Sequence, residues 1–189
     1  MRNVVRIAVF LLVVLLQIPA PSAINAPADV EPLTNQYYLP KVIELIEGAK
    51  TSINVIMYSM VWYDKYPDSP SNKLIKLLCD ASKRKINVTV ILNRDKKNDS
   101  ETQKNKTAAE KFQKAGVKVI YDSLEQTTHA KILIIDRRFV VIGSFNWSYY
   151  SLEKNNETAV VVDSTEIAEY FLKYFNSIAV RGFSVQHPE

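Results

Sequence analysis

The sequence predicts an α/β protein in which helices flank a mixed β-sheet on both faces. Short runs of β-branched and other apolar residues alternate along the chain with longer segments whose apolar residues recur at helical spacing. The 189 residues are 47% hydrophobic and include only 4 glycines, which suffices for one domain with a large core but not for two such domains. Strands and helices that alternate in this way typically pack as a sheet between two helical layers.

Residues 1–28 form a separate module. Arg2 and Arg6 precede an uncharged apolar run from Ile7 to Ile18, and small residues and prolines follow. The run is shorter than the roughly 20 residues that cross a bilayer as a helix. We therefore expect residues 1–28 to be a cleaved export signal, with an uncleaved membrane anchor as the alternative, and residues 29–189 to be a single exported domain, periplasmic or secreted.

The elements of this domain follow from local patterns along the chain. Apolar spacing, the caps Ser71 and Thr165, and a stop at Gly116 predict helices at 40–49, 72–84, 102–115 and 165–176. Runs of β-branched residues predict strands at 51–57, 87–92, 117–121, 131–136, 139–142 and 157–162.

Three segments escape this pattern, at 61–71, 93–101 and 147–156, and we expect them to be loops at strand ends. Such loops often carry substrate contacts. Trp147 and Tyr149 have two interpretations: they stack on bases or touch acyl chains, or they only cover one end of the sheet.

The strands predicted at 131–136 and 139–142 are joined by a tight turn and carry an informative set of polar groups. Because side chains alternate between the two faces of a strand, His129 and Lys131 share one face. A fixed lysine stabilises the negative charge that grows on a phosphodiester under attack, and a neutral imidazole attacks phosphorus or moves the leaving-group proton. The pair therefore indicates phosphodiester chemistry.

Further polar groups follow the second of these strands. Ser144 and Asn146 are alternate residues on one face and can donate hydrogen bonds to phosphate oxygens. Gly143 lets backbone and anion approach closely. These residues extend the predicted phosphate site.

The pattern His129-x-Lys131, four residues, Asp136, six residues, Gly143-Ser144-x-Asn146 resembles the signature of the phospholipase D superfamily. The resemblance covers residues 37–178 and implies that superfamily's α/β/α sandwich. It also implies that His129 is the nucleophile that forms a phosphohistidine. Lys131, Ser144 and Asn146 would bind the phosphate, and Asp136 would support the histidine.

Asp136 and Glu157 each have a second interpretation. Asp136 lies where a β-turn accepts any aspartate, so a turn role alone is the alternative. In the small bacterial members of the superfamily, an acidic residue just before a hydrophobic strand orients the nucleophilic histidine. Glu157 has that place in this sequence, and the alternative is a solvated carboxylate at the edge of a strand.

We expect no metal ion and no cofactor. The single cysteine, Cys79, excludes an internal disulfide and a cysteine-cluster metal site, and its apolar helical surroundings indicate a core residue. The sequence contains no His-x-x-x-His or His-Glu-x-x-His motif and no acidic cluster. The expected chemistry is therefore metal-independent.

Charge leaves the identity of the substrate open. The chain has 24 basic and 20 acidic residues, and loss of the N-terminal segment removes Arg2 and Arg6. Lysines nevertheless concentrate between Lys83 and Lys118. Such a run is usually the solvated face of a helix and loop, but beside a phosphodiester site it would also attract a nucleic-acid backbone.

The number of motifs predicts the assembly. Full-length phospholipases D carry the motif twice and use two histidines, one to attack and one to protonate the leaving oxygen, whereas this sequence has one His-x-Lys. The resemblance therefore implies a homodimer in which two copies of His129 and Lys131 form one composite site.

Short, exported, single-motif chains of this kind resemble the bacterial endonuclease branch of the superfamily. We therefore expect an endonuclease that acts on DNA or RNA. The alternatives are a phospholipase D-type hydrolase of membrane phospholipids such as cardiolipin, and a catalytically idle binding protein with the same fold.

Overall fold

The computed structural model describes residues 23–97 and 99–184 of the chain. Residues 1–22 of the predicted export signal lie outside the described residues, and so does His187, the second of the 2 histidines in the sequence. Within the described part, no helix is long and apolar enough to span a membrane.

The strands of the described residues are β1 (Asp29–Thr34), β2 (Ser52–Met57), β3 (Asn87–Leu92), β4 (Lys118–Tyr121), β5 (Lys131–Ile135), β6 (Phe139–Gly143), β7 (Thr158–Asp163) and β8 (Phe183–Ser184). They form one 8-stranded sheet in the order β1-β7-β6-β5-β2-β3-β4-β8. β2, β3 and β4 are parallel, and the other neighbouring strands are antiparallel. The sheet is therefore mixed, as the sequence predicts.

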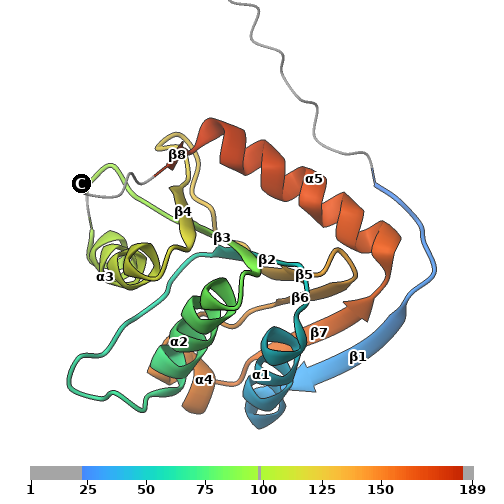
Figure 1. Ribbon diagram of the computed structural model, residues 1–189, viewed down its shortest axis with the longest axis horizontal. Helices are drawn as coiled ribbons and strands as arrows, with labels where there is room; N and C mark the ends of the chain where they lie inside the picture. The colour runs from blue at the N-terminus through green and yellow to red at the C-terminus, as the bar shows by residue number, and fades with distance from the viewer. Residues whose placement is uncertain (1–22, 98, 185–189) are drawn as a thin grey trace, which may run out of the picture.

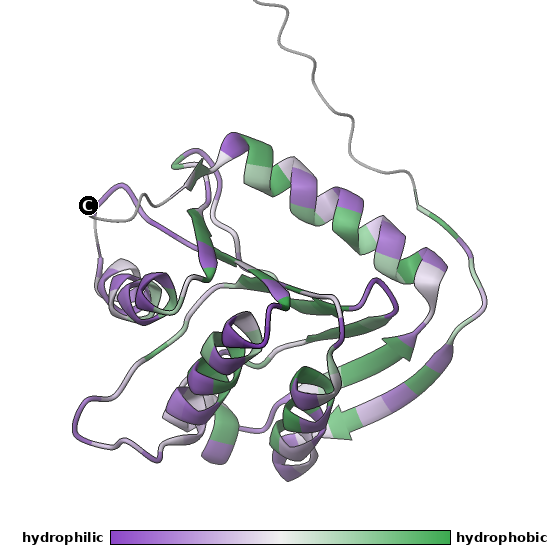
Figure 2. Ribbon diagram, in the orientation of Figure 1, coloured by the Kyte–Doolittle hydropathy of each residue, from purple (hydrophilic) through white to green (hydrophobic). Residues whose placement is uncertain are grey.

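Helices cover both faces of this sheet (Figure 1). α1 (Tyr38–Gly48), α2 (Pro70–Lys83) and α3 (Ser100–Lys114) lie on one face, and α5 (Thr165–Arg181) lies on the other. Figure 2 shows hydrophobic strands between helices that are polar on their outer sides. The predicted α/β/α sandwich is confirmed.

Two buried clusters lie on the two sides of the sheet, as expected when side chains alternate along each strand. Ile56 and Ile132 belong to the cluster under α5, together with Phe175 of that helix. The neighbouring Val55 and Leu133 belong to the larger cluster under α1, α2 and α3. The sheet is thus apolar on both faces, which leaves polar chemistry to the ends of its strands.

Several short elements differ from the prediction. β1 pairs with β7 at one edge of the sheet, and the sequence analysis missed it because only Leu33 of its residues is buried. Its Pro32 is tolerated because an edge strand has one unpaired side. The sequence analysis also missed β8, the 3-10 helix η1 (Asn35–Tyr37) and the short helix α4 (Tyr149–Glu153) within a predicted loop.

Helix starts are also corrected. Ser69 rather than Ser71 caps α2, because Pro70 suits the first helical position and the Ser71 hydroxyl donates to the carbonyl oxygens of Val61 and Trp147. Ser164 rather than Thr165 caps α5. That helix continues to Arg181, well beyond the predicted end at 176.

Gly116 ends α3 as predicted. Its φ of +76° is the left-handed conformation that glycine adopts without a steric penalty after a helix.

Candidate active site

The two ends of the β5–β6 hairpin differ in role. The turn is structural, and the open end carries the candidate catalytic residues. Its turn places Asp136 and Arg137 at φ values of 52° and 55°, and Arg138 N–H donates to the Ile135 carbonyl over 3.0 Å. Positive φ at both central positions is the pattern of a type I′ hairpin turn, which aspartate tolerates better than most residues.

The Asp136 carboxylate fixes this turn to the start of β2. It accepts hydrogen bonds from the backbone N–H groups of Lys50 (2.8 Å), Thr51 (2.8 Å) and Ser52 (3.0 Å), and from the Thr51 hydroxyl (2.9 Å). Partial burial opposes its ionisation, but these hydrogen bonds outweigh that effect and hold the pKa of Asp136 below the usual value. The role is that of a structural anchor.

Asp136 is therefore not brought to the other predicted site residues. It follows the C-terminal end of β5, whereas His129 and Lys131 lie at the N-terminal end. The structure corrects the interpretation that Asp136 supports His129 directly and favours the alternative turn role.

At the other end of the hairpin, His129, Lys131, Ser144 and Asn146 line one pocket of about 390 Å³. The antiparallel register brings the start of β5 beside the end of β6, because Ile132 pairs with Ile142. The predicted nucleophile and the three residues predicted to bind the phosphate therefore meet in one place.

His129 and Lys131 are in direct contact. The Lys131 ammonium nitrogen lies 3.1 Å from His129 Nδ1 and donates to the His129 carbonyl oxygen over 2.7 Å. Partial desolvation of the otherwise exposed ring and the charge of Lys131 both lower the pKa of His129. Burial lowers the pKa of Lys131 as well, although the Glu157 charge opposes this. The result is a neutral, exposed imidazole beside a buried cation, which is 8% exposed.

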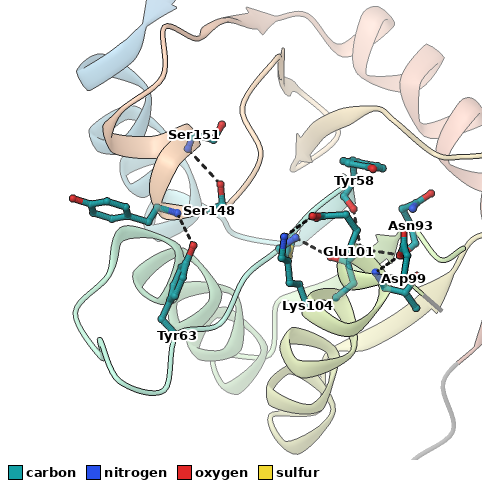
Figure 3. Close-up of polar contacts among 12 residues, drawn as sticks. Tyr58, Tyr63, Asn93, Asp99, Glu101, Lys104, Ser148 and Ser151 are labelled. Carbon is teal, nitrogen blue, oxygen red and sulfur yellow. Dashed lines mark hydrogen bonds and ion pairs between the residues drawn. The ribbon is translucent and has the colours of Figure 1, made fainter. Parts of the chain in front are cut away.

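Tyr58 is a site residue that the sequence analysis missed. It directly follows β2, its ring centroid lies 4.5 Å from that of His129, and the Lys131 ammonium lies 5.2 Å from the same ring. Figure 3 shows Tyr58 beside the first turn of α3, near Asp99 and Glu101. Its position just after a parallel strand was the available signal, since site residues gather at such ends. The ring of Tyr58 thus packs against the imidazole.

Glu157 joins the site through hydroxyl groups. One carboxylate oxygen accepts from Ser144 Oγ, and the other accepts from Ser151 Oγ (2.7 Å) and Asn155 Nδ2 (3.1 Å). Burial opposes ionisation of Glu157, but these hydrogen bonds and the charge of Lys131 outweigh it and lower its pKa. Among the described residues, no hydrogen bond joins Glu157 to His129 of the same protomer. The predicted orienting contact is therefore absent within one described chain.

Ser151 links two of the predicted site residues. Its hydroxyl accepts from the backbone N–H of Asn146 (2.9 Å) while it donates to Glu157, and the residue is only 3% exposed. No sequence signal identified it, because its role depends on α4, whose cap Ser148 is seen in Figure 3. The Ser151 hydroxyl thus links Asn146 to Glu157.

Asn146 carries an unused acceptor. Its Oδ1 atom is buried and has no hydrogen-bond partner within the described residues. An unpaired buried polar atom costs about 1–3 kcal/mol, and such atoms are rare outside functional sites. The atom lies on a residue that lines the pocket, so a ligand or a reorientation of the amide would satisfy it.

Two other predictions are decided by burial and packing. Trp147 is fully buried and donates to the Tyr38 hydroxyl over 3.2 Å, so it covers the sheet end, whereas Tyr149 is exposed. Gly143 is required because a Cβ there would collide with the Thr158 carbonyl and with Ala159 of β7. Close packing against β7, rather than approach of an anion, explains this glycine.

The lysine-rich segment between Lys83 and Lys118 is partly neutralised. Lys83 pairs with Asp80, Lys104 with Glu101, and Lys111 with Asp64.

Within the described residues, no group of three or more histidine, cysteine or acidic side chains could hold a metal ion.

The lowered pKa of His129 gives a direct test. The chain has only 2 histidines, so their ring resonances can be assigned with a His129→Asn variant and titrated by NMR. We expect His129 to titrate below the ordinary value of about 6.5. In Lys131→Met its pKa should rise, because the repelling charge is gone, but only partly, because the burial remains. A pKa at or above 6.5 in the unchanged protein would contradict this electrostatic picture.

The comparisons with known proteins agree with this geometry. Residues 42–179 match the family described as "Cardiolipin synthase, PLD-like domain". A phospholipase D from Rickettsia bellii is 28% identical over 142 residues, which are 75% of this chain and 63% of that protein. The chain thus spans less than two thirds of the length of that relative.

Solved structures show the same fold. A phospholipase D family member, Nuc from Salmonella typhimurium, has a TM-score of 0.69 at 25% identity, with 84% of this chain and 99% of that chain covered. NucT from Helicobacter pylori has a TM-score of 0.68 at 20% identity and is covered over its whole length. The matched family spans most of the described domain, including every residue of the candidate site. The chain belongs to the family of phospholipase D-like domains and, with it, to the phospholipase D superfamily.

Proposed function

We propose that the chain is a metal-independent phosphodiesterase and, within that class, an endonuclease that hydrolyses DNA or RNA. The observation that carries the proposal is the contact of His129 with Lys131 in a pocket that Ser144 and Asn146 also line. A neutral imidazole, a fixed cation and neutral hydrogen-bond donors are the groups that a phosphodiester under attack requires.

The reaction follows from these groups in two steps. His129 attacks phosphorus, a P–N bond forms as the P–O bond to the leaving group breaks, and a second, protonated imidazole gives its proton to the leaving oxygen. Water then attacks the phosphohistidine, loses a proton to the second imidazole, and releases His129. Lys131 and Asn146 hold the phosphate oxygens, where negative charge increases, and Ser144 donates to them once its single hydroxyl proton turns away from Glu157.

The second imidazole points to a homodimer. Within the described residues, His129 is the only histidine of the protomer. A two-fold axis near the pocket would bring the same residue from a second chain to the same phosphate. We further propose that Glu157, which makes no hydrogen bond to its own His129 among the described residues, positions the histidine across this interface.

We favour nucleic acid as the substrate because the likeness to Nuc covers 99% of that chain, whereas this chain matches only 63% of the phospholipase D from Rickettsia bellii. Phospholipid hydrolysis is the second candidate. It is favoured by the phospholipase D relatives and by the exposed side chains of Tyr149 and Tyr150 on α4, beside the segment that carries Asn146. In either case we propose export through residues 1–28, cleaved or retained as an anchor.

The proposal is tested by assays in the presence of a chelator. We expect hydrolysis of bis(p-nitrophenyl) phosphate and nicking of a plasmid to persist in EDTA, because His129 and Lys131 supply the nucleophile and the cation. A parallel assay measures release of headgroups from cardiolipin vesicles. Loss of activity in EDTA that a divalent ion restores would refute the metal-independent mechanism. Activity on vesicles alone would replace the nuclease with the phospholipase.

A further inference from the structure

A second pocket of about 360 Å³ lies between α5 and the loop that leads to His129. Its lining includes Tyr174, Ile178 and Arg181 of α5, and Ser123, Gln126 and Thr127 of the loop. The pocket thus combines one aromatic ring, one aliphatic side chain, a guanidinium group and several neutral hydrogen-bonding groups.

The pocket adjoins the candidate active site along the chain. Thr128 lines it, and His129 lines the catalytic pocket. Ala130 and Ile132 at the catalytic pocket pack with the same buried cluster as Tyr174. An extended chain advances at most about 3.5 Å per residue, so Thr127 lies within about 7 Å of His129 along the backbone. The linings of the two pockets therefore come within about 7 Å of each other along the backbone.

The loop between the two pockets is held in place by buried hydrogen bonds. The Asp122 carboxylate accepts from the backbone N–H groups of Arg94 and Thr128, both over 2.9 Å, and Asn93 Oδ1 accepts from Thr128 N–H over 3.0 Å. Asp122 is 1% exposed, so its charge is largely withdrawn from the pocket mouth. These hydrogen bonds hold the backbone of Thr128, which lies between the two linings.

Arg181 is the cation of this pocket. It is exposed, and Nη1 donates to Gln126 Oε1 over 3.1 Å while Nε donates to the Ser177 carbonyl over 3.0 Å. These contacts orient the planar group and, among the described residues, leave further N–H donors for an anion. Such a group binds phosphate oxygens with fixed geometry.

We propose that this pocket binds the nucleotide next to the scissile phosphate of a single-stranded nucleic acid, with its base on Tyr174 and its phosphate at Arg181. The inference rests on the proposed nuclease function and names its substrate class. A flat base suits an aromatic ring flanked by hydroxyl and amide groups, which an acyl chain does not require. Bases in a duplex are already stacked and paired, so only an unpaired base can enter.

The test measures binding, with cleavage prevented by His129→Asn in every protein. A fluorescently labelled single-stranded oligonucleotide is titrated, and anisotropy gives its Kd. We expect Tyr174→Leu to weaken binding by about 10-fold or more, since stacking of one base contributes about 1–3 kcal/mol. Arg181→Gln should weaken binding and reduce the slope of log Kd against log salt by about 1. Tyr174→Phe should retain the affinity because it keeps the ring.

Matched controls lie on the same helix. Lys173 is exposed and Tyr170 is half-buried, and neither lines the pocket, so Lys173→Gln and Tyr170→Leu should change Kd less than about twofold. Melting temperatures identify any variant that fails to fold. If Tyr174→Leu fails to fold, Arg181→Gln on the surface still tests the pocket.

The outcomes separate this inference from the proposed function. Pocket variants that bind as the controls do, or a protein that binds no oligonucleotide, would overturn the pocket assignment. If a duplex binds as tightly as the single strand, and the pocket variants weaken the binding of both equally, the single-strand preference is wrong. If the unchanged enzyme hydrolyses bis(p-nitrophenyl) phosphate but cuts no nucleic acid, the nuclease function fails, and selective loss of binding in the pocket variants would still support the pocket.

Discussion

Replacing His129 with asparagine is expected to reduce turnover of bis(p-nitrophenyl) phosphate and of nucleic acid by several orders of magnitude. The change removes the nucleophile, and no other histidine among the described residues of the chain lines the pocket. Because His129 is exposed and lies outside the buried clusters, the variant should keep its circular dichroism spectrum and melting temperature. Steady-state kinetics on both substrates measure the loss.

The chain offers a matched control in its other histidine. His187→Asn should retain full activity, because the mechanism assigns that residue no role. On the unchanged enzyme, rapid acid-free quenching should trap phosphohistidine, which is acid-labile, and His129→Asn should abolish it. Substantial turnover by His129→Asn would show that another group attacks phosphorus.

Mixed dimers of unchanged and His129→Asn chains are expected to be almost inactive. The proposed composite site needs one imidazole as nucleophile and one as general acid, so a mixed dimer lacks one of the two roles. Two affinity tags, one on each kind of chain, allow the mixed dimer to be purified from co-expressed protein and assayed.

Independent sites predict a different result for the same sample. Each mixed dimer would then keep about half the activity of the unchanged dimer, because one of its two sites would be intact. A doubly tagged dimer of unchanged chains controls for the purification. Sedimentation at the assay concentration completes the test, since a fully active monomer would be incompatible with the composite site.

The fold was accessible from the sequence where burial produces a pattern. The run of β-branched residues at 87–92 predicts β3 with its observed bounds, because five of its six residues are buried. β1 was missed since its residues are almost all exposed and its partner β7 is far away in sequence. Helix starts were misplaced by one or two residues because several hydroxyl groups compete as caps, and tertiary contacts such as that of Ser71 with Trp147 decide between them.

The candidate site was accessible only where residues are close in sequence. The contact of His129 with Lys131 follows from strand geometry alone. Tyr58 and Ser151 reach the site through sheet pairing and through a short helix, neither of which leaves a local signature. The helix that carries Arg181 was predicted to end too early, so the second pocket could not be foreseen.

The anchoring role of Asp136 changes what the superfamily signature reports. The aspartate holds the turn in register with β2, so its presence indicates a correctly built hairpin. The histidine, lysine, serine and asparagine line the pocket, so their presence indicates catalytic capacity. A related chain that kept the aspartate and glycine but had lost the histidine would fold and match the family, yet would not turn over substrate. The signature therefore has two parts with different meanings. The aspartate and the glycine indicate the fold, and only the histidine, lysine, serine and asparagine indicate an enzyme.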